Sequence, residues 1–380
     1  MALTDCLLLQ VLEAAQKAAN ASQGKLKVTY SPGVVVQSVD TSGIAKAADS
    51  ARAADLAIVV VGDTAEGVGY DGSASTGEGA DRPSIALAGV QLDLINEIIA
   101  TGTPTVIVLV HGRPASFGED EGGAITSKFG RVPLYMQAGA VVAAFRPGVE
   151  GGNAIWSLLT GEESFSGRLA QAWPHSAGAA HYGGISPWFE KVCSEECPGL
   201  TMDIHAGMPH GLSLNPTSPA FPFGYGLDYL SVSLLNATVS LNAGYRAMRT
   251  ATDDAPITVH VKLHNAASRG GSKVVQVYFT PPVSPSRLTR YHHMLGGFAK
   301  VPIDAGGDAA VDIPIPARNL AHWVPAESAR GESRAGHTVD AGEYTVYVCH
   351  DSRGLGGDAG QVEGLSEAET GKCIKSTVTL

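Results

Sequence analysis

A short acidic stretch near the start of the chain carries the residues most able to do chemistry. Residues 62–84 read GDTAEGVGYDGSASTGEGADRPS and include the carboxylates of Glu66, Glu78 and Asp81 and the guanidinium of Arg82. A carboxyl group whose pKa is raised can act as general acid or base on a sugar oxygen. The alternative interpretation is a solvated acidic loop without chemistry, in which Asp81 and Arg82 form an ion pair that anchors the loop.

The same stretch contains the pattern G-x-G-x-x-G at residues 67–72, which is typical of dinucleotide-binding loops. In such loops the first glycine ends a strand, and a helix begins within the motif so that its amides hold the pyrophosphate. Here Gly67 lies several residues beyond the apolar run, and no helical period appears before Pro83. We therefore expect no nucleotide cofactor. The glycines instead predict a mobile loop that nothing apolar ties to the core before Ile85.

The elements that must position this loop alternate between apolar runs and helical patterns. Uninterrupted apolar runs are typical of parallel strands covered on both faces, and apolar residues at i, i+3 and i+4 indicate helices. The first part of the chain, residues 1–175, is therefore predicted to be an α/β layered sandwich, a mainly parallel sheet with helices on both faces. The acidic loop follows a strand, at the edge where ligands gather in such sheets. The predicted strands span residues 26–31, 56–62, 103–112, 140–145 and 167–173, and the helices span 1–25, 42–54 with Ser42 near the N-cap, 87–102 and 151–161.

The rest of the chain has a different character. Residues 176–222 are rich in Pro, His, Ser and Gly and predict an irregular connection. Residues 223–380 predict an all-β sandwich of the fibronectin-III-like type, because about seven alternating segments are separated by turn residues. These segments span residues 229–241, 256–266, 272–282, 292–303, 309–316, 342–351 and 373–380, with a turn at 340–342.

Composition excludes several classes of function. The chain has 380 residues, 44% of them hydrophobic, and a formal net charge of −11, so it is a folded globular protein with no basic stripe for nucleic acid. No apolar run reaches the ~18–20 residues of a membrane span. The N-terminal residues lack the basic region of a signal peptide and predict an amphipathic helix. The sequons at Asn20 and Asn236 are glycosylation sites only if the chain is exported.

The five cysteines are an odd number, so at least one thiol is free or pairs outside the chain. Cys349 ends one predicted strand and Cys373 opens the next, which predicts a disulfide if the two strands are neighbours. Cys193 and Cys197 lie four residues apart without a second pair, so we expect no metal site there. The histidines nearby are interpreted as solvated loop residues: His175, His181, His205 and His210.

Several motifs resemble one enzyme family over nearly the whole chain. The strings ADLAIVVVGDTAEG, GEGADRPSIALAGVQLDLI and AAFRPGVEGGNAIWSLLTGEESFSGRLAQAWP resemble the C-terminal α/β domain of glycoside hydrolase family 3. FPFGYGLDY, SKVVQVYFTPP and DAGEYTVYV are similar to the fibronectin-III-like domain that follows it. ARNLAHWV and VDAGEYTVYVCHDSRG look closest to the β-xylosidase and α-arabinofuranosidase branch.

The resemblance implies the architecture of a retaining β-glycosidase, in which a nucleophilic carboxylate forms a glycosyl intermediate and a separate acid/base assists. In the family, the nucleophile lies on an N-terminal (β/α)8 barrel, whereas the first residues here already resemble the approach to the α/β domain. We therefore expect the C-terminal part of such an enzyme, as a fragment, a separate subunit or a reused domain. The expected partners are a barrel domain or other protein chain and, if the chain takes part in catalysis, a β-glycoside carbohydrate.

The family's acid/base residue comes from a loop like the acidic one, at either of two positions. AEG in some members matches Glu66, and GEGxDR in others matches Glu78, Asp81 and Arg82. Glu78 is slightly preferred, because the Asp–Arg pair fits the family pattern at the right spacing. His111 stands where many relatives have serine before glycine, and it is interpreted as a lining residue.

Two hypotheses follow for the function. The first is an enzyme half that hydrolyses O-glycosyl bonds of the β-xylosidase or β-glucosidase type, supplying the acid/base but not the nucleophile. The alternative is a non-catalytic interaction or structural module of the same fold within a larger assembly. The isolated chain is expected to be inactive, and no cofactor or metal is expected. The resemblance implies an extracellular or cell-wall location, although we expect no signal peptide in this chain.

Overall fold

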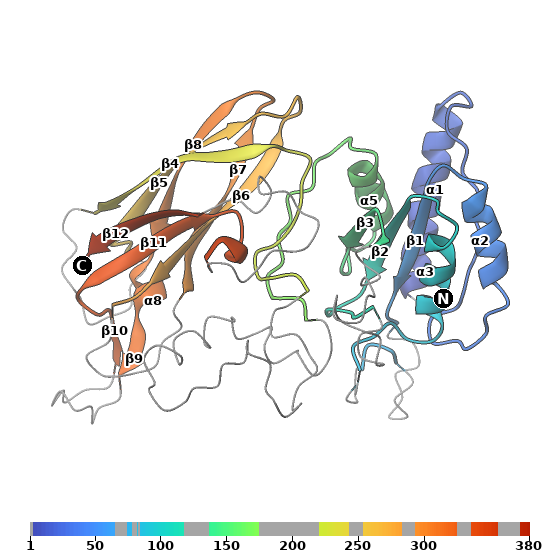
Figure 1. Cartoon of the computed structure of the whole chain (residues 1–380), viewed down its shortest axis with the longest axis horizontal. Coiled ribbons are helices and arrows are strands. Elements are labelled where there is room, and N and C mark those ends of the chain that lie inside the picture. Colours follow the sequence, from blue (N-terminus) through green and yellow to red (C-terminus); the bar gives the residue numbers. More distant parts are fainter. Residues whose placement is uncertain are drawn as a thin grey trace. The chain divides into compact units, whose positions relative to one another are not determined.

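The computed structural model describes residues 3–64, 74–77, 82, 84–117, 137–174, 220–242, 254–282, 293–324, 336–355 and 373–380. The chain forms two compact units (Figure 1). The first is built around Met1–Glu163, and the second around Thr217–Leu380, with Ser164–Ala172 joined to the second.

The first unit contains a three-stranded parallel sheet in the order β1-β2-β3, as predicted. Its strands are β1 (Ala57–Gly62), β2 (Thr105–Val110) and β3 (Ala140–Ala143). Ala57 lies opposite Thr105, and Val106 lies opposite Ala140. Because Val, Ile and Leu occupy both faces of these strands, both faces need an apolar cover.

Helices provide that cover on both faces of the sheet (Figure 1). They are α1 (Leu3–Ala21), α2 (Ile44–Arg52), α3 (Gln91–Ile99) and α5 (Gly151–Leu159). Val11 of α1 and Ile155 of α5 pack with Val108 and Val110 on one face. The alternate β2 side chains, such as Leu109, point to the opposite face, which α2 and α3 cover, and Leu109 is fully buried. The layered α/β arrangement is therefore confirmed.

One local prediction near the N-terminus is wrong. Residues 26–31, all of which the structure describes, form no strand, and Tyr30 is 44% exposed, so this segment has no buried face to place in a sheet. Ser42 lies next to the N-cap of α2, as predicted: the N-cap is Gly43, and the amide of Ser42 donates to the Asp40 carboxylate at 2.8 Å.

The predicted strand at residues 167–173 is also absent from the sheet. Leu169 exchanges backbone hydrogen bonds with Tyr225 at 2.9 Å and with Gly224 at 2.8 Å. The segment therefore pairs locally with the approach to the second unit, to which Ser164–Ala172 belongs, and not with the parallel sheet.

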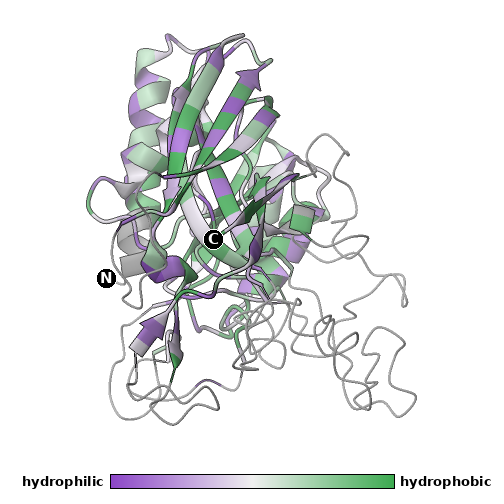
Figure 2. Ribbon diagram, turned by 90° about the vertical axis from the view of Figure 1, so that its left-hand side faces the viewer, coloured by the Kyte–Doolittle hydropathy of each residue, from purple (hydrophilic) through white to green (hydrophobic). Residues whose placement is uncertain are grey.

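The second unit is a sandwich of two antiparallel sheets, with strand orders β12-β11-β6-β7 and β4-β5-β8. The strands are β4 (Val232–Leu241), β5 (Ile257–Asn265), β6 (Gly271–Thr280), β7 (Met294–Ile303), β8 (Asp308–Ile315), β11 (Glu343–Cys349) and β12 (Ile374–Thr379). All seven predicted strands are thus confirmed. Figure 2 shows hydrophobic and hydrophilic residues alternating along them. In β5, Val259 and Val261 are buried in the shared core, and His260 between them is not.

Tyr344, at the start of β11, fixes the turn that precedes it. Its ring is fully buried, and its hydroxyl donates to the backbone carbonyl of Asp340 at 2.8 Å. This tyrosine corner is typical of immunoglobulin-like sandwiches. Gly342 in the turn has a φ of +142°, which only glycine adopts easily.

Three short elements were not predicted: α8 (Ala317–Leu320), the hairpin of β9 (His322–Val324) with β10 (Gly336–Thr338), and a 3-10 turn, η5 (Ser352–Leu355). They are too short to show a period in the sequence. Leu320 and Val324 are nevertheless buried.

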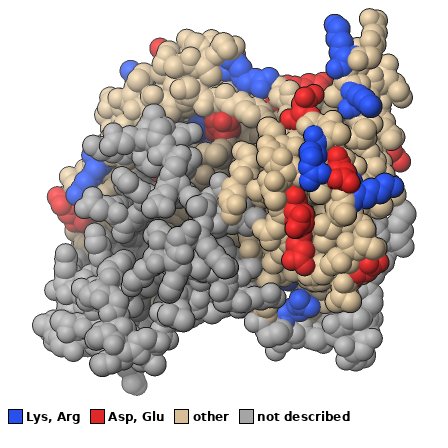
Figure 3. Space-filling view, turned by 45° about the vertical axis from the view of Figure 1, so that its right-hand side comes forward, with Lys and Arg blue, Asp and Glu red and all other residues tan. Residues whose placement is uncertain are grey.

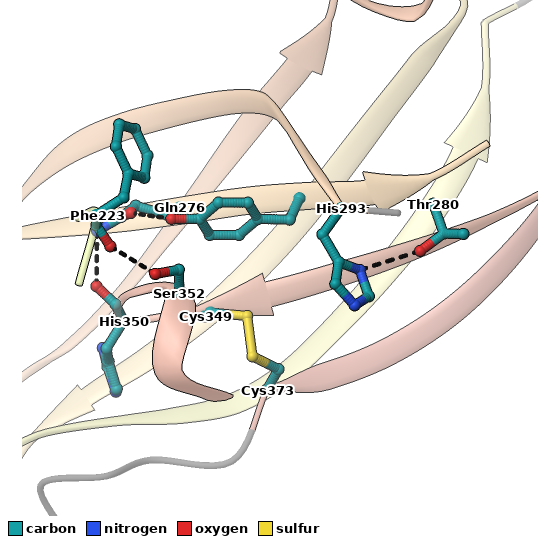
Figure 4. Close-up of a disulfide and its surroundings, with 9 residues drawn as sticks. Phe223, Gln276, Thr280, His293, Cys349, His350, Ser352 and Cys373 are labelled. Carbon is teal, nitrogen blue, oxygen red and sulfur yellow. Dashed lines mark hydrogen bonds between the residues drawn. A yellow bond between two sulfur atoms is a disulfide. The ribbon is translucent and has the colours of Figure 1, made fainter. Parts of the chain in front are cut away.

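A disulfide joins Cys349 at the end of β11 to Cys373 just before β12, with a Cα–Cα distance of 4.5 Å (Figure 4). The bridge continues the register in which Val348 lies opposite Ile374. The predicted pairing is therefore confirmed. Close by, Nε2 of Gln276 donates to the carbonyl of His350 at 2.7 Å.

Charged side chains of both signs are interspersed on the face shown in Figure 3, and neither sign gathers into a stripe there. Asp49 and Arg52 of α2 form one exposed ion pair. Among the described helices, none combines the length and apolar character needed to cross a membrane.

Candidate functional site

The three parallel strands end at one edge of the first unit, and each is followed by a side chain of possible function. The amide of Asp63 donates to the carbonyl of Val110 at 3.0 Å, and the amide of His111 donates to the carbonyl of Phe145 at 3.1 Å. These bonds extend the ladder one residue beyond β1 and β2 and two residues beyond β3. An acid, an imidazole and an aromatic ring are thereby placed side by side at the edge where α/β sheets bind ligands.

Gln91 of α3 fixes the end of β1. Its Oε1 accepts from the amide of Gly62 at 2.8 Å, and its Nε2 donates to the carbonyls of Gly62 at 3.0 Å and Ala88 at 2.9 Å. Gly62 has no room for a side chain, because a Cβ there would lie 1.8 Å from the carbonyl oxygen of Val110. The buried amide of Gln91 therefore satisfies backbone groups at the end of β1 that a further strand would otherwise pair with.

Arg113 connects three segments around this edge. Its Nη2 lies 3.3 Å from Oδ2 of Asp63 and donates to the carbonyl of Ser75 at 3.3 Å. Its Nη1 donates to the carbonyls of Ile85 at 3.2 Å and Pro114 at 3.1 Å. One guanidinium thus ties the end of β1 to the middle of the acidic loop and to the segment that follows the loop.

The middle of the acidic loop is held at its base. Ser75 is fully buried, and its Oγ accepts from the amide of Thr64 at 2.8 Å. The amide of Thr76 donates to the carbonyl of Thr64 at 3.3 Å. The sequence shows nothing apolar that ties the loop to the core before Ile85, yet residues 74–77 are held there. Small polar contacts hold this segment, and a search for apolar periodicity does not detect them.

Asp63 gives the edge its electrostatic character. Its side chain is 1% exposed, and burial raises the pKa of its carboxyl group. Arg113, a hydrogen bond from Ser75, and the more distant charges of Arg82 and Arg146 oppose this increase. Among the described residues, three guanidinium groups therefore act on this one buried carboxyl group.

His111 is a neutral ring in this site. Burial lowers its pKa to about 4, and its Nδ1 contacts the carbonyl of Arg113. A carbonyl requires a donor at Nδ1, so Nε2 is an acceptor. Nε2 is buried and has no hydrogen-bond partner among the residues that the structure describes. The ring lies edge-on to Trp173, with centroids 5.1 Å apart, and 5.5 Å from the ring of Phe145.

Phe145 has an unusual backbone for its residue type. Its φ of +51° lies in the left-handed region, and its ring is 42% exposed. Such strain in a non-glycine residue persists only where the surroundings impose it, and it concentrates at functional sites. Phe145 is thus a half-exposed aromatic surface beside the buried His111.

The residues predicted from the sequence divide into two groups. Arg82 and His111 lie at this edge, whereas Glu66, Glu78 and Asp81 fall outside the described residues, as does the glycine pattern at 67–72.

Sequence reasoning missed four residues that build the edge: Asp63, Ser75, Gln91 and Arg113. Asp63 follows a buried strand directly, and this position could have identified it. The other three act through contacts with backbone far along the chain.

No group of three metal-ligating side chains gathers among the described residues. Cys193, Cys197 and the histidines near them fall outside these residues.

Comparison with known proteins gives matches over both units. A family model described as the glycosyl hydrolase family 3 C-terminal domain matches residues 6–229, and a fibronectin type III-like model matches residues 273–352. A periplasmic beta-glucosidase of Salmonella typhimurium is 27% identical over 311 residues, which are 81% of this chain and 34% of that protein. A beta-xylosidase of Formosa agariphila is 26% identical over 295 residues, 76% of this chain and 34% of that protein.

The fold has counterparts among solved structures. DesR, a beta-glucosidase from Streptomyces venezuelae, matches with a TM-score of 0.60 at 24% identity, covering 89% of this chain and 35% of that one. This chain spans about a third of the length of the curated relatives described above. Because the family model covers more than half of its residues, the chain belongs to glycosyl hydrolase family 3 and comprises that family's C-terminal domain followed by a fibronectin-III-like domain.

Proposed function

We propose that this chain is the part of a retaining β-glycosidase that supplies the general acid/base and one wall of the sugar site. The observation that supports this most is the fixed base of the acidic loop. Glu66 lies three residues after Asp63, and Glu78 lies three residues after Ser75, and both reference residues are buried. Three residues reach at most about 11 Å, so either carboxylate would act close to this edge.

Glu78 is the better assignment of the two. It lies in the stretch of four residues, 78–81, between Gly77 and Arg82, and the structure describes both of these flanking residues. Glu66 lies in a longer stretch, residues 65–73. Because a shorter connection loses less entropy when it is ordered, Glu78 can be positioned at a lower cost.

The chemistry would use two carboxyl groups about 5–5.5 Å apart, as in retaining glycosidases. Glu78 would protonate the leaving-group oxygen and then, as a carboxylate, accept a proton from the attacking water. The nucleophile would come from a separate barrel domain. Phe145 offers an aromatic surface to the sugar, and the buried, neutral His111 lies beside it without exchanging protons near neutral pH.

The substrate class that we propose is a β-xyloside or β-glucoside. The relatives include enzymes named for both sugars. The motifs ARNLAHWV and VDAGEYTVYVCHDSRG favour the xylosidase branch.

The test uses the chain joined to, or mixed with, its nucleophile-bearing domain. Glu78→Gln should lose hydrolysis of alkyl β-xylosides and β-glucosides but keep glycosyl-enzyme formation from dinitrophenyl glycosides, whose leaving group needs no proton. Azide should restore turnover. Glu66→Gln is the matched control and should behave like the parent. If neither substitution changes turnover, the chain is a non-catalytic module. The isolated chain should be inactive, and turnover by it would contradict the proposal that the nucleophile lies on another domain.

A further inference from the structure

We propose that Asn236 carries an N-linked oligosaccharide. The sequence Asn236-Ala237-Thr238 is an acceptor sequon, and it lies within β4. The inference concerns the export and surface of the second unit and does not depend on the proposed glycosidase activity.

The backbone of β4 turns the reactive side chains of the sequon outward. Ala237 is buried in the core at 7% exposure, so its neighbours Asn236 and Thr238 point away from the core, and both are exposed. A register irregularity between Leu234 and Asn236 interrupts the alternation at this point. As a result Leu235, at 56% exposure, also lies at the surface beside the sequon.

The surroundings can accept a sugar chain without disturbing the core. Thr238 lies opposite His260, whose Nε2 is 2.8 Å from Oγ of Ser240 and whose Nδ1 is 2.7 Å from Asp312. This outer face is polar, and sugar hydroxyls can exchange hydrogen bonds with it. The apolar face of a pyranose ring could cover the exposed Leu235.

The position in the sheet gives the modification a physical benefit. β4 is the first strand in the order β4-β5-β8, so one of its sides has no hydrogen-bonded neighbour within that sheet, and β12 of the other sheet lies near it. Exposed edge strands tend to pair with other chains, and natural proteins block this with charge, bulges or cover. A branched, hydrated oligosaccharide at Asn236 would obstruct such pairing.

The disulfide supports passage through a compartment where glycans are attached. Cys349 and Cys373 form a bridge at a Cα–Cα distance of 4.5 Å, and Cys349 is fully buried. Disulfides form and persist in the secretory pathway and outside the cell, and they are rare in the cytosol.

The reaction belongs to the host's transferase. Nδ2 of Asn236 would attack C1 of the oligosaccharide of a lipid-diphosphate donor. The C1–N bond forms, the C1–O bond to the diphosphate breaks, the lipid diphosphate leaves, and the amide loses one proton.

The second sequon, at Asn20, provides an internal comparison. It lies in the last turn of α1, and the hydroxyl of Ser22 already donates to the carbonyl of Ala19 at 2.7 Å and accepts from the amide of Leu26 at 3.0 Å. These two hydrogen bonds engage the sequon hydroxyl at the C-terminal end of α1. We therefore assign the glycan to Asn236 only.

The experiment begins with protein purified from its native source. Peptide N-glycosidase F in heavy-oxygen water should convert Asn236 to labelled Asp in the peptide that covers β4. Recovery of that peptide unmodified before the enzyme treatment would overturn the proposal.

Matched variants in the native host separate the glycan from the side chain. Thr238→Ser keeps the sequon and should keep the glycan, whereas Thr238→Val destroys it and should remove the glycan mass. Asn20→Gln should leave that mass unchanged. A mass shift that disappears in Asn20→Gln and persists in Thr238→Val would refute the assignment. The Thr238→Val protein should also aggregate faster than Thr238→Ser on mild heating, and equal rates would refute the protective role.

Discussion

Asp228 holds two buried cations together, and its loss should destabilise the second unit strongly. Its side chain is 2% exposed, and Oδ2 accepts from Nζ of Lys273 at 2.8 Å and from Nη2 of Arg168. Oδ1 accepts from the amide of Leu230 at 3.0 Å. Lys273 lies on β6, and Arg168 belongs to the segment that was predicted to be a strand of the first sheet. One carboxylate therefore fastens this segment to the sandwich.

The magnitude follows from burial. The side chains of Arg168 and Lys273 are 6% and 13% exposed, so Asp228→Ala would leave two positive charges in a nearly dry site. Breaking a buried ion pair by removing one partner costs about 3–5 kcal/mol. Burial already lowers the pKa of Lys273, and Asp228 is the main opposing cause. In the variant the lysine pKa should fall further.

The sign of the pH dependence is then fixed. A lysine whose folded pKa lies below its unfolded value binds fewer protons when folded, so stability rises with pH between the two values. Asp228→Ala should therefore recover part of its lost stability as the pH rises toward the ordinary lysine value of about 10.4.

Hydrogen exchange is the suitable assay, because a chain of two units need not unfold in one step. Amides in the core of β5 and β6 should lose about two to three and a half orders of magnitude of protection in Asp228→Ala, which is ~3–5 kcal/mol. The control Asp308→Ala removes an exposed partner, at 77% exposure, of His264 and should change protection less than about tenfold. A loss of less than tenfold in Asp228→Ala would refute the reasoning.

Three further predictions concern other parts of the molecule. Changing Cys349 and Cys373 to serine opens a loop of sequence separation 24 and should lower the stability of the second unit by about 3 kcal/mol, measured by hydrogen exchange. Unchanged protection would mean that the bridge does not constrain the unfolded chain. Burial raises the pKa of Asp63, so the folded state binds its proton more tightly and this group's contribution to stability falls as pH rises above ~4. The stability of Asp63→Asn relative to the parent protein, measured by thermal unfolding, should thus be higher at pH 7 than at pH 4. The reverse order would contradict the burial argument. Arg113→Met should speed cleavage of the acidic loop by Glu-C protease at least about tenfold. The exposed control Arg52→Met should not speed it. Equal cleavage rates in the two variants would show that Arg113 does not hold the loop.

Much of this architecture follows from the sequence alone. The apolar runs that became β1 and β2 predicted a parallel sheet, because strands covered on both faces must be apolar at every position. Most of the seven sandwich strands follow from alternation, since one face of such a strand is buried and the other is not. In β6, by contrast, residues on both faces are buried from Val275 to Phe279. Because Cys349 ends one predicted strand and Cys373 opens the next, the sequence also predicted the disulfide between them.

Only the tertiary structure decided which segments join which unit and which residues form the functional edge. Residues 167–173 have a strand-like pattern, but their hydrogen bonds go to Gly224 and Tyr225, over fifty residues away in the sequence. Arg113 and Gln91 likewise act on backbone groups from distant segments. Periodicity reports which face of an element is buried. It does not report which distant carbonyl or carboxylate a polar side chain will meet, because that partner is chosen when the elements pack.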